Sequence, residues 1–251
     1  TKSNDRTFLH NRIAGIDSWY KNKMVEGDIY SIELHHLKQM FELEREQLVV
    51  NLQRGGYIKT EPVKQAFLAV PRDEFVPGFL KKYAYVDTPL DIGQGQTISA
   101  PHMVAIMCES LDIHQGQKIL EIGTGSGYHA AVVAQLVGKT GLVYTIERFE
   151  SLAKKAQEAL ELTGNTNVTV EVGDGSSGLP AYQPYDRIYV TCAAPSIPPP
   201  VLEQLHDPGK LLIPIGDMYC ELTLLEKEKG KTALRHLGGC VFVPLVGKHG
   251  F

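Results

Sequence analysis

A glycine-rich loop between a short apolar strand and an apolar helix constrains this sequence more than any other feature. Residues 118–123, KILEIG, form the predicted strand, and residues 128–138, YHAAVVAQLVG, form the predicted helix. Between them, Gly123, Gly125 and Gly127 remove every second side chain. Such a loop lets a ligand approach the backbone closely. A tight turn needed only for packing would also place glycines here, so the loop alone does not identify a ligand.

The alternation of strand and helix continues towards the C-terminus. Further strands are predicted at 142–147, 168–173, 186–193 and 210–216, with helices at 150–164 and 200–205, and two last strands lie near CELTLLEKE and CVFVPLV. Repeated β-α-β units imply an α/β fold with a doubly wound, Rossmann-like, mostly parallel sheet. The final pair of strands is typical of a hairpin, which predicts an antiparallel edge.

The segment upstream of the loop is organised differently. Helical periodicity begins at Ser31 and continues to about Arg54, where two glycines end it. A second short helix is predicted in EPVKQAFLAV, because Pro62 suits a first helical turn. Pro71 then begins a predicted loop that extends to Ile98.

The composition argues against several kinds of partner. A net charge of −4 and a pI near 6.1 give no broad basic surface, which non-specific nucleic-acid binding requires. No apolar run approaches the length of a membrane span, and the first residues, TKSNDRTFLHNR, lack the apolar centre of a signal peptide. We therefore expect a soluble, cytoplasmic protein with no nucleic-acid or membrane partner. The sequence does not determine its oligomeric state.

The residues that commonly bind metals are unfavourably spaced. The four cysteines are scattered, form no C-x-x-C pair and stand among apolar neighbours: Cys108, Cys192, Cys220 and Cys240. His35 and His36 are adjacent, so on a helix their side chains point about 100° apart and chelate poorly. We predict no metal site and four buried thiols.

Acidic residues stand at the ends of three successive predicted strands. Glu121 belongs to the glycine loop, Glu147 ends the second strand, and Asp174 follows the third in Gly-Asp-Gly. A carboxylate at the second position can accept both ribose hydroxyls, and one at the third can accept the exocyclic amine of adenine. The G-x-G-x-G spacing differs from the G-x-G-x-x-G of dinucleotide sites, which favours S-adenosylmethionine over NAD without excluding NAD.

Six segments, in order, resemble the protein-L-isoaspartate O-methyltransferase family. They are VPRDEFVP (70–77), AYVDTPLDIGQGQTISAPHMVA (84–105), LEIGTGSGYHAAVVA (120–134), GDG (173–175), PYDRIYVTCAAP (184–195) and FVPLVGKHGF (242–251). The string QTISAPHM is highly specific to that family. The resemblance runs from about residue 43 to the C-terminus. It implies a class I methyltransferase domain over 43–251, preceded by a partly helical extension over 1–42.

The resemblance also implies an activity and a set of site residues. The activity is methyl transfer from S-adenosylmethionine to the free carboxylate of L-isoaspartyl residues in damaged proteins and peptides, which starts repair through a succinimide and leaves S-adenosylhomocysteine. Acceptance of D-aspartyl residues stays open. By position, Ser99 becomes the catalytic residue. The implied cofactor contacts are Gln96, Thr97, Ile98, Ser99 and Val104 at the substrate junction, Glu121 at the methionine part with the glycine loop, Glu147 at the ribose, and Asp174 with Gly175 at the adenine.

The chemistry of carboxyl methylation suits these residues. A carboxylate with a reference pKa of about 3.5 is already ionised at neutral pH, so no strong general base is needed. Ser99 can donate a hydrogen bond to it, and Pro101 can open a helix whose free N–H groups attract an anion. Ser99 would also suit a helix N-cap, a role compatible with catalysis. His102 would either line the pocket or bond to the backbone at the helix start.

Three other functions compete with this prediction. A nucleic-acid N-methyltransferase often carries an Asn/Asp-Pro-Pro-aromatic string after the fourth strand, where this sequence has Thr-Cys-Ala-Ala-Pro. An NAD-dependent oxidoreductase would be distinguished by which cofactor raises the melting temperature. A cofactor-binding scaffold without catalysis is disfavoured by the intact Ser99 and glycine loop.

Overall fold

The computed structural model describes residues 26–251, with side chains from residue 35 onward. It separates an N-terminal unit, Thr1–Leu43, from a larger unit, Glu44–Phe251. Most of the extension expected over 1–42 therefore lies outside the described residues. Its last part belongs to helix α2 (Glu26–Arg54), which begins before the predicted Ser31.

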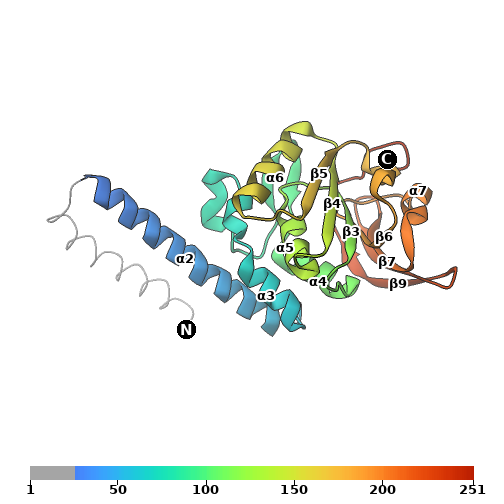
Figure 1. The fold of residues 1–251 in the computed structure, drawn as a ribbon, viewed down its shortest axis with the longest axis horizontal. Helices are drawn as coiled ribbons and strands as arrows, with labels where there is room; N and C mark the ends of the chain where they lie inside the picture. The colour runs from blue at the N-terminus through green and yellow to red at the C-terminus, as the bar shows by residue number, and fades with distance from the viewer. Residues whose placement is uncertain (1–25) are drawn as a thin grey trace. The chain divides into compact units, whose positions relative to one another are not determined.

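The larger unit is built on a seven-stranded sheet in the order β5-β4-β3-β6-β7-β8-β9. The strands are β3 (Lys118–Ile122), β4 (Leu142–Glu147), β5 (Val168–Val172), β6 (Tyr185–Val190), β7 (Leu205–Gly216), β8 (Cys220–Glu228) and β9 (Lys231–Cys240). Neighbouring strands from β5 through β4, β3 and β6 to β7 pair in parallel. Strand β8 pairs antiparallel with both β7 and β9. Figure 1 shows the sheet running from β5, in yellow, to β9, in red. This confirms the doubly wound, mostly parallel α/β fold with an antiparallel edge.

Five helices accompany the sheet in the larger unit: α3 (Glu61–Ala69), α4 (Pro101–Leu111), α5 (Tyr128–Val137), α6 (Glu150–Leu162) and α7 (Pro199–Glu203). Short 3-10 turns lie at Arg72–Phe75, Gly78–Tyr83, Gly175–Ser177 and Pro180–Tyr182. The predicted loop from Pro71 to Ile98 contains the first two of these turns and a hairpin of β1 (Leu90–Gly93) and β2 (Gln96–Ile98). Elements this short carry too little periodicity to be recognised in the sequence.

The two faces of the sheet bury different kinds of side chain. Leu120 and Ile122 of β3 belong to an apolar cluster that includes Val201 of α7. Glu121 alternates with them and therefore points to the other face, where it stands beside Tyr189 of β6. His129 of α5 covers that tyrosine, with 4.4 Å between the ring centroids. Buried polar groups thus gather on the face covered by α5.

The C-terminal part differs from the prediction of a strand near CVFVPLV. The last strand, β9, ends at Cys240, which pairs with Cys220, the first residue of β8. The two strands are joined by a turn at Lys229 and Gly230, with φ of 52° and 73°. Most of β9 is solvent-exposed, so it lacks the apolar alternation that reveals a strand. The apolar residues after it run beside Ala193, whose N–H donates to Val243 O at 2.8 Å. Strand β7 also begins earlier than predicted, at Leu205.

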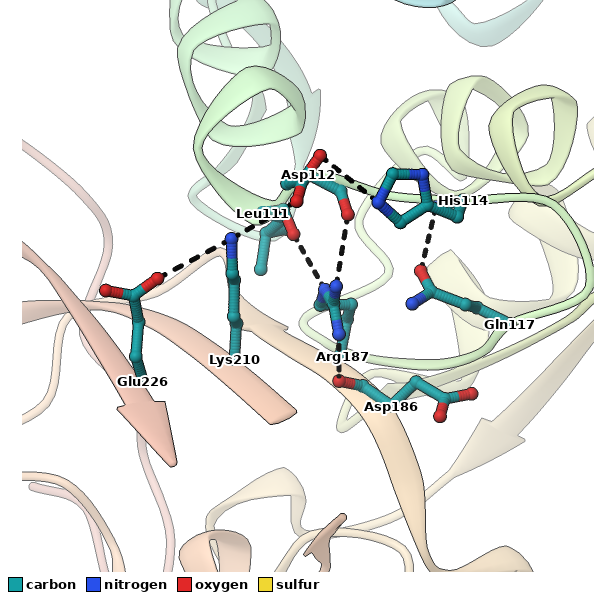
Figure 2. A network of polar contacts seen from close by, with 8 residues as sticks. All are labelled: Leu111, Asp112, His114, Gln117, Asp186, Arg187, Lys210 and Glu226. Atoms are coloured by element: carbon teal, nitrogen blue, oxygen red, sulfur yellow. Dashed lines mark hydrogen bonds and ion pairs between the residues drawn. The ribbon is translucent and has the colours of Figure 1, made fainter. Parts of the chain in front are cut away.

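A polar network closes the C-terminal end of α4 at the amino edge of the sheet, and Figure 2 shows it. Arg187 donates from Nε to Leu111 O at 2.7 Å and from Nη2 to Asp112 O at 3.2 Å. Lys210 forms longer ion pairs with Asp112, at 3.4 Å, and Glu226, at 3.5 Å. A guanidinium at a helix C-terminus satisfies carbonyls that have no partner within the helix. The network therefore anchors α4 to β6 and β7.

Candidate active site

A cavity lies at the carboxyl ends of β3, β4 and β6, where the strand order reverses around β3. This is where open α/β sheets bind ligands. It is lined by ten of the residues predicted from the sequence: Gln96, Thr97, Ile98, Ser99, Val104, Glu121, Gly123, Gly125, Glu147 and Gly175. Residues from the β1–β2 hairpin, α4 and three strand ends thus meet around one space. Gly127 and Asp174 do not line it.

The glycine loop forms part of the cavity wall, and its glycines serve different purposes. Gly123 has a φ of 99°, and a Cβ there would collide with Oγ1 of Thr191, which donates to Gly123 O at 2.6 Å. Gly127 has a φ of 86°, and a Cβ there would come within 3.2 Å of Ala156 in α6. Gly127 therefore serves helix packing, which is why it lies away from the cavity.

Glu147 connects the end of β4 to the glycine loop. Its Oε2 accepts the N–H of Gly125 at 2.9 Å, and its Oε1 accepts the N–H of Phe149 at 3.0 Å. Only 6% of the residue is exposed. Each carboxylate oxygen has a further lone pair, so the group is held in place and can still accept hydrogen bonds from a ligand.

Glu121 is fully buried and lies at the inner end of the cavity. Thr145 donates to its Oε2 at 2.5 Å. Its Oε1 is enclosed without a well-formed hydrogen bond to any described residue. Desolvation raises the pKa of Glu121 to about 8, although hydrogen bonding from Thr145 and Tyr189 opposes this rise. A buried carboxylate oxygen without a partner, in a residue that lines a cavity, is suited to a cationic ligand group.

Ser99 lines the cavity, and a buried arginine holds its backbone. Arg72 donates from Nη2 to Ser99 O at 2.8 Å and from Nε to Ala84 O at 2.9 Å. The guanidinium lies over the ring of Tyr128, 4.7 Å from the centroid. Desolvation lowers the pKa of Arg72 to about 10, so it stays charged at neutral pH. The main chain of Ser99, the proposed catalytic residue, is therefore hydrogen-bonded to a buried side chain.

The N-terminus of α4 differs in detail from the expectation. The helix does begin at Pro101, but its N-cap residue is Ala100, so Ser99 is not the N-cap. Asp87 supplies the acceptor instead: its Oδ1 accepts the N–H of His102 at 2.9 Å and lies 2.9 Å from His102 Nδ1. An anion on this first N–H would meet an existing carboxylate. His102 is therefore paired at the helix start.

Asp174 holds the C-terminal segment. Its carboxylate accepts the N–H of Ser176 at 2.9 Å and that of Lys248 at 2.8 Å. Desolvation would raise the pKa of Asp174, but these hydrogen bonds outweigh it and lower the pKa. Its neighbour Gly175 lines the cavity. Of the two residues predicted to contact the adenine, Gly175 therefore lines the cavity and Asp174 does not.

Several cavity residues escaped the sequence reasoning. Tyr128 and His129 lie in an apolar helix, where the sequence pattern indicates core residues. Residues 243–246 line the cavity but were assigned to a strand. The match of 242–251 to the resembling family was the available signal, although no role was carried over to these residues. Cys192 also lines the cavity, and burial raises the pKa of its thiol, which keeps it protonated.

Two kinds of feature are absent from the described residues. No group of three or more His, Cys, Asp or Glu side chains there is placed to hold a metal ion. No helix among residues 26–251 is long and apolar enough to cross a membrane.

Comparison with known proteins gives consistent matches. Residues 43–250 match the family described as protein-L-isoaspartate(D-aspartate) O-methyltransferase. The protein-L-isoaspartate O-methyltransferase of Methanococcus aeolicus is 54% identical over 206 residues, which cover 82% of this chain and 95% of that protein. That of Methanopyrus kandleri is 55% identical over 216 residues, covering 85% and 96%.

A solved structure supports the same relationship. A protein-L-isoaspartate O-methyltransferase from Plasmodium falciparum, in complex with S-adenosyl-L-homocysteine, aligns with a TM-score of 0.74 and 28% identity. The alignment covers 80% of this chain and 98% of that one. With its sheet order, its cavity and these matches taken together, the chain belongs to the protein-L-isoaspartate(D-aspartate) O-methyltransferase family.

Proposed function

We propose that this chain transfers a methyl group from S-adenosylmethionine to the free carboxylate of L-isoaspartyl residues in damaged proteins and peptides. Its place in the family supports this activity. The observation that carries the proposal is the cavity itself, because Ser99 and Glu121, whose Oε1 is buried without a well-formed partner, both line it. A bound cofactor would span that space between the two residues.

The cavity residues fit the cofactor by their chemistry. Glu121 offers a carboxylate oxygen to the ammonium group of the methionine part. Glu147 offers its remaining lone pairs to the ribose hydroxyls, and Gly175 with Asp174 is proposed for the adenine. Gly123 and Gly125 keep the wall free of side chains. When bound, S-adenosylmethionine supplies an electrophilic methyl group on a sulfonium and leaves as S-adenosylhomocysteine.

The chain's own contribution to the transfer is positioning. The substrate carboxylate is ionised at neutral pH, so no residue has to remove a proton. Ser99 donates a hydrogen bond that orients this carboxylate, and Arg72 keeps the Ser99 backbone in place. Such positioning can lower a barrier by about 7–11 kcal/mol. In the resulting methyl ester, the following backbone nitrogen attacks the carbonyl and expels methanol, and the succinimide formed then hydrolyses without enzyme groups.

The proposal also covers partners and location. The substrates are proteins and peptides, with no nucleic-acid or membrane partner. A cytoplasmic location is supported by the four cysteines, all of which are unpaired. Residues 1–42 are proposed to be an accessory extension without a catalytic group, ahead of a methyltransferase domain over 43–251. A shortened chain that begins at Phe41 should keep cofactor binding and activity; a folded but inactive chain would contradict this division.

The substrate is tested with two peptides that are identical except for aspartate or isoaspartate at one position. Incubation with labelled S-adenosylmethionine should give base-labile methyl label on the isoaspartyl peptide alone. Ser99→Ala should lose most of this activity. Ser110→Ala is the control, because Ser110 lies in α4, the helix that follows Ser99, and donates to Ile106 O at 2.7 Å within that helix. A D-aspartyl peptide shows whether that substrate is also accepted.

Each other outcome has a definite meaning. Equal labelling of the two peptides would indicate a general carboxyl methyltransferase. Label on nitrogen, or on RNA offered in the same assay, would contradict the proposed function.

A further inference from the structure

A row of polar side chains crosses the three central strands beneath the cavity. Glu121 of β3 is paired in register with Thr145 of β4 on one side and with Tyr189 of β6 on the other. All three residues have no exposed surface. Their side chains point to the same face of the sheet, because residues in register on neighbouring strands share a face. A polar row in the centre of a sheet is costly unless its atoms find partners.

The row is only partly satisfied. Thr145 Oγ1 donates to Glu121 Oε2 and lies 2.7 Å from Thr124 Oγ1. Three atoms in and over the row have no well-formed partner among the described residues: Glu121 Oε1, Tyr189 Oη and His129 Nδ1. The Tyr189 hydroxyl lies near enough to Glu121 to stabilise its charged form. Unsatisfied buried atoms are uncommon in native proteins, and three in one place suggest a missing ligand.

His129 covers this row from α5. Its ring packs on Tyr189, and its Nε2 lies 3.5 Å from Cys108 Sγ. Desolvation lowers the pKa of His129 to about 3, so the ring is neutral. A neutral imidazole has one donor and one acceptor nitrogen. If Nε2–H donates to the sulfur, then Nδ1 is the acceptor, and it has no partner.

The row borders the cavity, since Glu121 and His129 both line it, although their unpartnered atoms are themselves buried. A carboxylate oxygen and an imidazole nitrogen are both acceptors. Together they suit a small cation with several N–H donors, and a primary ammonium group carries three such donors. Of the groups near Glu121, His129 is neutral, burial raises the pKa values of Cys108, Cys192 and Tyr189, and Glu147 adds a second carboxyl. Arg148, which carries a guanidinium, also lines the cavity.

We propose that His129 and Glu121 together bind the α-ammonium group of the cofactor's methionine part, with Tyr189 as the positioning residue for Glu121. This inference rests on the proposed function, since it assigns residues to the same cofactor. It adds a recognition role for two side chains on α5 and β6. It also predicts that the site selects the complete cofactor over its nucleoside fragment.

Two ligands separate this role from a purely structural one. S-adenosylhomocysteine carries the ammonium group, whereas 5′-methylthioadenosine has the same nucleoside and sulfur but no amino-acid end. Binding of each is measured by calorimetry to the full-length wild-type protein and to Tyr189→Phe and His129→Leu. Each substitution should weaken S-adenosylhomocysteine about tenfold, as expected for a hydrogen bond involving a charged group, and leave 5′-methylthioadenosine within twofold.

Tyr185→Phe is the matched control for Tyr189→Phe. Tyr185 is a buried tyrosine of the same strand, but its hydroxyl donates to Leu179 O at 2.6 Å and belongs to the opposite face. This variant should bind both ligands as the wild type does. Thermal melts of all variants establish that they are folded, and His129→Asn, which keeps an acceptor, should recover part of the affinity lost in His129→Leu.

The outcomes are distinguishable. Equal losses for the two ligands, or no loss for either, would overturn the ammonium site. The same holds if the wild type binds both ligands equally well. A wild-type protein that binds no S-adenosylhomocysteine at all would instead contradict the proposed function.

Discussion

Arg72 Nη2 donates a hydrogen bond to the carbonyl oxygen of Ser99 at 2.8 Å, so a fully buried guanidinium fixes the backbone of the proposed catalytic residue. The same guanidinium bonds Ala84 O and packs on Tyr128, which lines the cavity. The main chain at Ser99 is therefore held in place by a residue of the core.

Arg72→Lys should reduce kcat/KM for an isoaspartyl peptide by about tenfold to a hundredfold, because a lysine cannot bond both carbonyls and a shift of about 1 Å is enough for this loss. Affinity for S-adenosylhomocysteine should change little. Arg187→Lys is the control, since Arg187 also bonds main-chain carbonyls, three in number, but at the opposite edge of the sheet (Figure 2). Both variants should melt earlier; an equal loss of kcat/KM in both would contradict the positioning role.

Cofactor affinity should depend on pH through Glu121. Its pKa of about 8 means that the carboxyl is mostly protonated at neutral pH, whereas an ammonium ligand requires the charged form. Between pH 6 and 7.5, the affinity for S-adenosylhomocysteine should rise with pH by up to about tenfold per unit, as one proton is released on binding. Calorimetry in buffers of different ionisation enthalpy counts that proton. Glu121→Gln should bind weakly and show no such dependence.

The same carboxyl should make the ligand-free protein less stable at higher pH. A folded-state pKa raised from 4.5 to about 8 contributes stability that is complete below about pH 4.5 and is lost as the pH rises through 8. Glu121→Gln has no charge to bury, so its melting temperature should exceed that of the wild type by several degrees at pH 8 and by little at pH 5. Each 1 kcal/mol of unfolding free energy shifts the melting temperature by roughly 2–4 °C in a domain of this size. An unchanged difference across this range would be inconsistent with a buried ionising group.

Replacement of Glu147, which lines the cavity, and of Asp174, which does not, tests whether each carboxylate contacts the nucleoside of the cofactor. Each alanine variant should weaken S-adenosylhomocysteine by about tenfold or more if its carboxylate accepts hydrogen bonds from the nucleoside. Asp174→Ala should in addition lower the melting temperature, because the N–H groups of Ser176 and Lys248 lose their acceptor. Calorimetry and thermal melts of both variants provide the check, and unchanged binding in both would refute the nucleoside contacts.

Gly247→Ala should damage the site from outside the cavity. A Cβ there would collide with the Asp174 carboxylate and lie 2.6 Å from Ser176 Oγ, so the C-terminal segment must shift. Residues 243–246 of that segment line the cavity, and peptide methylation should fall along with the melting temperature. Gly239→Ala is the control, because a Cβ at that position meets no atom within 4 Å. Steady-state kinetics of the two variants compare them directly.

The main strands were predictable because their local pattern agrees with their place in the sheet. The run KILEI is apolar except for Glu121, as expected of a strand buried on both faces, and β3 occupies the predicted residues. Ser99, Glu147, Gly123 and Gly125 line the cavity and were proposed from the sequence because the strand ends and the family-like segments mark them. Edge strand β9 and the short turns between Pro71 and Ile98 were missed, since their conformation depends on neighbours rather than on their own periodicity.

The sequence by itself thus determined the alternation of strands and helices from Lys118 to Gly216, the ligand-binding edge and the family, because these depend on apolar periodicity and on contiguous motifs. Only the tertiary structure decided which polar groups meet. Arg72 and Ser99 are separated by 27 positions, and Glu121 meets Tyr189 only because β3 and β6 pair in that register. The tertiary structure also decided that Asp174 accepts the N–H of Lys248 in the C-terminal segment, and that Asp87 accepts the N–H of His102 at the start of α4. These contacts join distant residues through sheet register and helix packing, which no local pattern contains.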